Sequence, residues 1–90
     1  MLPEEKITIE KKKRAFSILK DKKKLTLKDK EKLISDLTIL LGIYATNRSK
    51  ELEKLIKAMI DFGKSKLLAV QGVIVEFNRF KTGQIKVKKV

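Results

Sequence analysis

Residues 33–63 read LISDLTILLGIYATNRSKELEKLIKAMIDFG, and the spacing of their apolar side chains predicts two amphipathic helices. In the first helix the apolar residues recur every three or four positions, at Leu33, Leu37, Leu40, Leu41 and Tyr44. Upstream, Thr26 followed by Asp29 is typical of a capping box, in which the hydroxyl and the carboxylate satisfy free backbone N–H groups. We expect Gly42, near the end of the run, to terminate this helix.

The second helix carries its own apolar stripe, at Leu52, Leu55, Ile56, Met59 and Ile60. Asn47 or Ser49 is expected to cap its N-terminus. Acidic residues in its first turn favour the helix dipole, and Gly63 is the predicted stop.

The N-terminal segment is predicted to form a third helix, from about Pro3 or Glu10 to Lys22. Its apolar face consists of Ala15, Phe16, Ile18 and Leu19. Residues 7–9 leave an alternative open, because two isoleucines flanking a threonine are also typical of a short strand.

The C-terminal segment has the residue types of a β-hairpin. Residues 73–80 are rich in β-branched and aromatic side chains, residues 81–83 carry a turn signal, and residues 84–90 alternate apolar and basic. Residues 67–72 are interpreted as a helical tail or as the entry to the first strand. We therefore predict an α-dominant α+β fold, with two or three helices followed by a hairpin, and treat residues 1–90 as one small basic domain.

Composition excludes several kinds of chemistry. The 90 residues contain no Cys and no His, which removes thiolate nucleophiles, disulfides and the usual zinc ligands. The four glycines are scattered, so they form no phosphate-cradling loop. Carboxylates that lie close in sequence are interpreted as solvated helix faces rather than as a magnesium site. We expect no enzymatic activity, no cofactor and no metal.

Positive charge is the strongest functional signal. The chain has 23 Lys and Arg against 11 Asp and Glu, a formal charge of +12. Residues 1–32 carry 12 basic and 6 acidic side chains, residues 64–90 carry 7 and 1, and the residues between carry 4 of each. Because like charges repel in a compact fold, this excess favours a polyanionic partner, whose binding releases counterions.

The predicted nucleic-acid contacts are basic residues near both termini. They are Lys11, Lys12, Lys13, Arg14, Lys20, Lys22, Lys23, Lys24, Arg79, Lys81, Lys86, Lys88 and Lys89. Lysine suits phosphate contacts, whereas arginine, which reads bases better, is scarce, so we expect little sequence specificity. Phe80, between two basic residues, is the aromatic side chain expected at the surface, and Phe16, Tyr44 and Phe62 are expected in the core.

The predicted order of three helices and a hairpin resembles that of winged-helix domains. The resemblance implies a helix-turn-helix around Gly42, a groove-reading helix from about Ser49 and a wing tip at residues 81–84. Helix-turn-helix patterns want apolar residues about six and nine positions after the turn glycine. This chain has Arg48 and Glu51 there, so the resemblance is one of element order only.

We therefore expect a non-enzymatic protein that binds DNA or RNA through phosphate contacts, alone, as a homodimer or as a small subunit of a nucleoprotein complex. The alternative is a protein-interaction adaptor that docks on an acidic partner or stabilises a larger enzyme, with residues 52–60 as its interface. Attachment to anionic lipid through residues 10–24 ranks last, because little apolar bulk lies there. The chain starts without an apolar signal segment, so we expect an intracellular, cytoplasmic protein.

Overall fold

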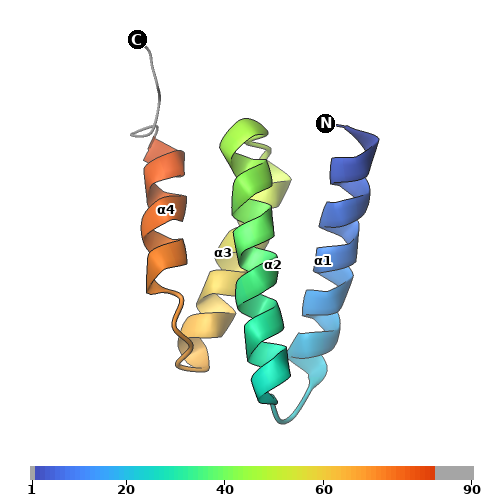
Figure 1. Cartoon of the computed structure of the whole chain (residues 1–90), viewed down its shortest axis with the longest axis vertical. Helices are drawn as coiled ribbons and strands as arrows, with labels where there is room; N and C mark the ends of the chain where they lie inside the picture. The colour runs from blue at the N-terminus through green and yellow to red at the C-terminus, as the bar shows by residue number, and fades with distance from the viewer. Residues whose placement is uncertain (1, 83–90) are drawn as a thin grey trace.

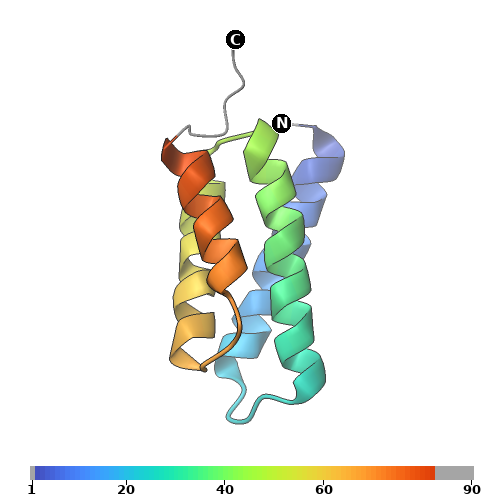
Figure 2. The ribbon, with the colours of Figure 1, turned by 60° about the vertical axis from the view of Figure 1, so that its left-hand side comes forward.

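The structure, a computed structural model, describes residues 2–82 of the chain. These residues form four α-helices and the turns that connect them (Figure 1). They are α1 (Pro3–Asp21), α2 (Leu27–Thr46), α3 (Lys50–Ser65) and α4 (Gln71–Thr82). Successive helices run in opposite directions, so α1 and α3 point one way and α2 and α4 the other (Figures 1 and 2). The described part of the chain is therefore all-α.

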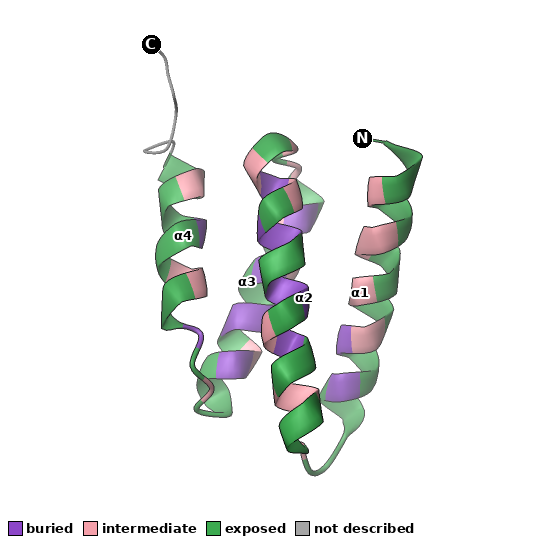
Figure 3. Cartoon of the chain, viewed as in Figure 1, coloured by how far each residue is buried: buried purple, intermediate pink, exposed green. Residues whose placement is uncertain are grey.

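α2 lies at the centre of the fold. It packs against α1, α3 and α4, and α1 and α4 flank it on opposite sides (Figure 1). Its inward residues Leu37 and Leu40 have no exposed surface, and the inward faces of α2 and α3 are coloured as buried in Figure 3. The apolar stripe of α3 meets them, since Leu52, Ile56, Met59 and Ile60 are all buried in the same core. That stripe is core, so it is not available as the interface that the adaptor hypothesis requires.

The predicted start of α2 is confirmed at atomic detail. Thr26 accepts a hydrogen bond from the Asp29 backbone N–H at 3.1 Å, and the Asp29 carboxylate accepts one from the Thr26 N–H at 2.9 Å. The predicted end was wrong, because α2 continues past Gly42 to Thr46. Tyr44, which follows the glycine, is buried against α4, and this packing extends the helix.

The predicted caps of α3 are confirmed at one end only. Ser49 caps the helix by accepting a hydrogen bond from the Leu52 N–H at 3.0 Å. Gly63 does not stop it, because the helix continues to Ser65. The glycine instead permits a close approach, since a Cβ atom there would lie 2.9 Å from a methyl group of buried Val70.

α1 confirms the predicted N-terminal helix and extends over residues 7–9, which therefore form no strand. It buries Phe16 and Leu19 and leaves most of its length exposed. One side of the helix thus faces the core and the rest faces solvent.

The predicted C-terminal β-hairpin was wrong. Residues 73–80, the expected first strand, belong to α4, and so do Lys81 and Thr82 of the expected turn. Their apolar side chains recur at helical as well as strand positions, and the helical face packs on α2 with the Phe77 ring 5.5 Å from Tyr44. Strand propensity largely measures packing on a neighbouring strand, so a helical partner overrides it. The expected second strand, residues 84–90, lies outside the described residues.

Two further expectations fail with the hairpin. Phe80 is half-buried beside the same core as Phe77, because a spacing of three places both on one side of a helix. The resemblance to winged-helix domains also ends here, since it requires a wing at residues 81–84, and residues 81–82 are helical.

Tyr44 joins three helices near one end of the molecule. Its ring packs on Phe77 of α4, and its hydroxyl donates a hydrogen bond to Glu53 of α3 at 3.0 Å. Burial, followed by the hydrogen bond to the Glu53 carboxylate, raises the pKa of the Tyr44 phenol above its usual value.

None of the described helices is long and apolar enough to cross a membrane.

Candidate nucleic-acid interface

The run Lys11–Arg14 does not form one basic patch. It lies within α1, where each residue is turned by about 100° from the one before. Lys11 and Arg14, three positions apart, lie on one exposed side of the helix, Lys13 is exposed on another side, and Lys12 is turned inward. Consecutive basic residues in a helix therefore spread their charge around the axis.

Lys12 is committed to the fold. Its ammonium nitrogen lies 3.0 Å from Asp36 Oδ1 on α2, and the Asp36 side chain is 6% exposed. Because a buried carboxylate is costly without its counterion, this pair joins α1 to α2. Lys12, a predicted nucleic-acid contact, is therefore engaged within the fold.

The turn between α1 and α2 concentrates basic side chains. Lys20 lies in the last turn of α1, and residues 22–24 follow it in the connection to α2. Lys22 binds the Asp29 carboxylate at 2.7 Å, whereas Lys23 and Lys24 are exposed and have no carboxylate within ion-pair distance in the described chain. Two of the predicted contacts are thus free for a ligand at this turn.

Asp29 gives this turn a measurable pH dependence. The hydrogen bond from Lys22, then the backbone N–H of Thr26, lowers the pKa of the Asp29 carboxyl from 3.8 to about 2. A carboxyl whose pKa is lower in the folded state stabilises the fold above its unfolded pKa and loses that effect as pH falls toward 2. We expect Asp29→Asn to destabilise the protein at pH 7, with the difference from wild type vanishing between about pH 4 and pH 2.

Urea unfolding followed by circular dichroism at several pH values measures this difference. Subtracting the two proteins removes the titration of the other carboxylates, which they share. A difference that persists unchanged at pH 2 would show that the Asp29 charge does not stabilise the turn.

The antiparallel arrangement brings a second turn to the same end of the molecule. α1 and α3 run in the same direction, so the connections that follow them lie together (Figures 1 and 2). The rings of Phe16 and Phe62 meet edge to face at 5.6 Å, and Lys20 and Lys66 stand over these rings at 5.5 Å and 5.7 Å. Lysines far apart in the sequence thus flank one aromatic pair.

We call this region the lysine-rich end. It comprises Lys20, Lys22, Lys23, Lys24, Lys28, Lys64 and Lys66. The acidic residues near these lysines in sequence are Asp21, Asp29, Glu31 and Asp61, and Asp29 is already paired with Lys22. Sequence reasoning missed Lys64 and Lys66 as site residues. The signal that could have found them is the alternation of helix direction, which brings the two turns together.

The opposite end of the molecule has mixed charge. Glu4, Glu5, Glu51 and Glu53 lie there with Lys6, Arg48, Lys50 and Lys54. Arg79 and Lys81, at the C-terminal end of α4, also point to this end (Figure 1). The structure therefore does not join them to Lys20–Lys24, and Lys86, Lys88 and Lys89 lie outside the described residues.

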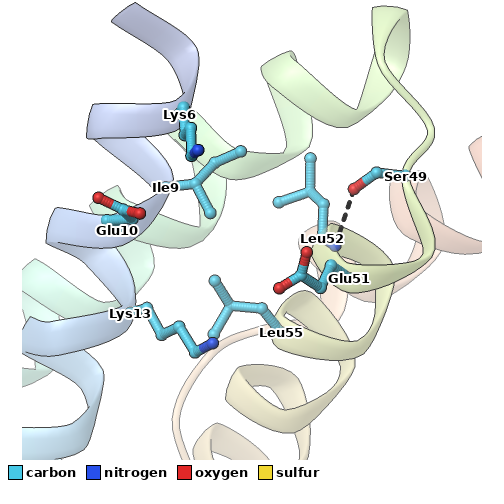
Figure 4. A pocket seen from close by; sticks show the side chains of 8 residues that line it. All are labelled: Lys6, Ile9, Glu10, Lys13, Ser49, Glu51, Leu52 and Leu55. Atoms are coloured by element: carbon cyan, nitrogen blue, oxygen red, sulfur yellow. Dashed lines mark hydrogen bonds between the residues drawn. The ribbon is translucent and has the colours of Figure 1, made fainter. Parts of the chain in front are cut away.

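A groove between α1 and α3 has a different character (Figure 4). It encloses about 280 Å³ over an apolar floor of Ile9, Leu52 and Leu55. Lys6 and Lys13 line it together with Glu10 and Glu51, so charges of both signs meet there. Such a balance gives no preference for a polyanion.

Residues 2–82 contain no cluster of three or more side chains suited to hold a metal ion. Comparison of the chain with protein-family models, with curated proteins and with solved structures gave no match.

Proposed function

We propose that this protein binds nucleic acid through its lysine-rich end, making phosphate contacts with little sequence preference, alone or as a small subunit of a nucleoprotein complex. The observation that carries the proposal is the meeting of two lysine-bearing turns, with Lys20 and Lys66 on one aromatic pair. Two turns that present ammonium groups side by side match the regular charge of a phosphate backbone.

Electrostatics supports the proposal. Ammonium groups gathered at one end repel one another, and phosphates relieve that repulsion while releasing their own counterions. The described chain forms two ion pairs, both of which also join α1 to α2 or cap a helix. The remaining lysines of the end form no ion pair within the described chain.

Fluorescence anisotropy of labelled duplex DNA, single-stranded DNA and RNA at several salt concentrations tests the proposal. With about five phosphates contacted on a duplex, the slope of log affinity against log salt is expected to be roughly −4.5. Replacing Lys23 and Lys24 by glutamate removes two contacts, so affinity falls about 60-fold at 0.1 M salt and the slope shrinks to roughly −2.7.

Lys50→Glu with Lys54→Glu is the matched control, because it changes the net charge equally at the mixed-charge end. We expect it to keep the slope of the wild type. Equal losses for both pairs would show that net charge alone attracts the ligand, and affinity that ignores salt would contradict the proposal outright.

A further inference from the structure

Leu67 is held in a backbone conformation that disfavours leucine. Its φ is 60°, the left-handed region, where it directly follows the C-cap of α3. The Leu68 N–H donates to the Gly63 carbonyl at 2.9 Å and the Leu67 N–H donates to the Lys64 carbonyl at 3.0 Å. This is the Schellman pattern of helix termination, in which glycine is the usual residue because a Cβ atom is strained there.

The leucine side chain contributes little to the core. Leu67 is 92% exposed, so burial of its side chain does not offset the backbone strain. Its neighbour Lys66 flanks the Phe16–Phe62 pair, which places the leucine at the lysine-rich end. Leu27, 72% exposed, begins α2 at the same end. The apolar tip of this end consists of Leu27 and Leu67.

The two turns that carry these leucines are neighbours. Leu68 and Ala69 line one surface hollow together with Lys30, Glu31 and Ile34 of α2. The α3–α4 turn therefore lies against the first turns of α2, the helix that Leu27 begins. An apolar tip surrounded by ammonium groups fits a ligand that is anionic outside and apolar inside.

We propose that Leu67 is an apolar wedge that enters between base pairs of a duplex while the surrounding lysines hold the phosphates. The inference rests on the proposed function and names its duplex partner. Apolar side chains inserted from the minor groove unstack a base step and kink the DNA, and leucine is among the residues that act in this way.

An anionic lipid surface has the same two chemical features, but it fits less well. Even one acyl chain holds a protein only marginally at a membrane, and two leucine side chains bury much less apolar area. A base step needs only one inserted side chain. The size of the apolar tip therefore favours a duplex.

The test compares Leu67→Gly with Leu67→Met and uses duplexes that contain 2-aminopurine, whose fluorescence rises on unstacking. Glycine relieves the left-handed strain, so Leu67→Gly is expected to raise the thermal midpoint by about 2–5 °C, which shows that the fold is intact. The same variant loses duplex affinity about tenfold and gives no fluorescence rise, with an unchanged salt slope, because no charge is altered. Leu67→Met is expected to keep both the duplex affinity and the fluorescence rise of the wild type.

Ile7→Gln is the matched control, an exposed apolar residue on α1 away from the lysine-rich end. It is expected to behave as the wild type. If Leu67→Gly binds and unstacks the duplex as well as the wild type does, insertion of Leu67 is contradicted, whereas the proposed phosphate contacts are not. If the wild type binds no nucleic acid, the wedge falls together with the proposed function. Leu67-dependent sedimentation with phosphatidylglycerol vesicles, without an effect on duplex binding, would assign the tip to lipid and overturn the inference.

Discussion

Reversal of four lysines at the lysine-rich end, two near each turn, is expected to lower duplex affinity about 4 × 10³-fold at 0.1 M salt. The variant carries Lys23→Glu and Lys24→Glu after α1 together with Lys64→Glu and Lys66→Glu at the C-terminal end of α3. At this salt concentration each phosphate contact contributes a factor of about eight relative to 1 M salt, and four contacts multiply. Anisotropy titration against one duplex measures the loss.

The two pairs taken separately test whether the turns form one surface. If both contact the same duplex, each pair lowers affinity by a similar factor, and the fourfold variant combines the two losses. Lys6→Glu, Arg48→Glu, Lys50→Glu and Lys54→Glu change the net charge equally at the mixed-charge end and serve as the control. A full loss from the α1–α2 pair with none from the α3–α4 pair would show that the ligand does not reach the second turn.

Three of the four helices follow from local sequence. The capping box at Thr26 and the cap at Ser49 need only residues three positions away, and the apolar stripes of α2 and α3 repeat over several turns. α4 could not be assigned in this way. Val73, Phe77 and Phe80 fit both a strand-rich composition and a helical spacing, and the contact of Phe77 with distant Tyr44 decides between them.

The sequence predicts that the candidate site is rich in lysine, but it does not predict which lysines belong to it. The lysines after α1 are visible as a cluster in sequence, yet Lys12 and Lys22 bind carboxylates whose position depends on how α1 packs on α2. Lys66 joins the site only because α3 runs parallel to α1. Runs of lysine in the sequence therefore locate the lysine-rich end approximately, and helix direction determines which lysines share it.

Leu37→Ala is expected to have the largest effect on stability. Leu37 is fully buried on α2, the helix that contacts all three others. Removing a buried leucine side chain costs about 3 kcal/mol through lost burial and the cavity that remains. A chain of this length is expected to have a free energy of unfolding of about 5–13 kcal/mol, so the variant loses a large share of it. Urea unfolding followed by circular dichroism measures the change.

Ile39→Ala is the internal control, because Ile39 lies two residues along the same helix and is 41% exposed. We expect it to cost less than about 1 kcal/mol. The lysine-rich end depends on the same core, since α2 holds the helices that present both turns. If the proposed function holds, a duplex that binds only the folded state should raise the unfolding midpoints of both Leu37→Ala and the wild type. Equal costs for the two substitutions would contradict the difference in burial between Leu37 and Ile39, and a midpoint that duplex leaves unchanged would show that the folded state does not bind it.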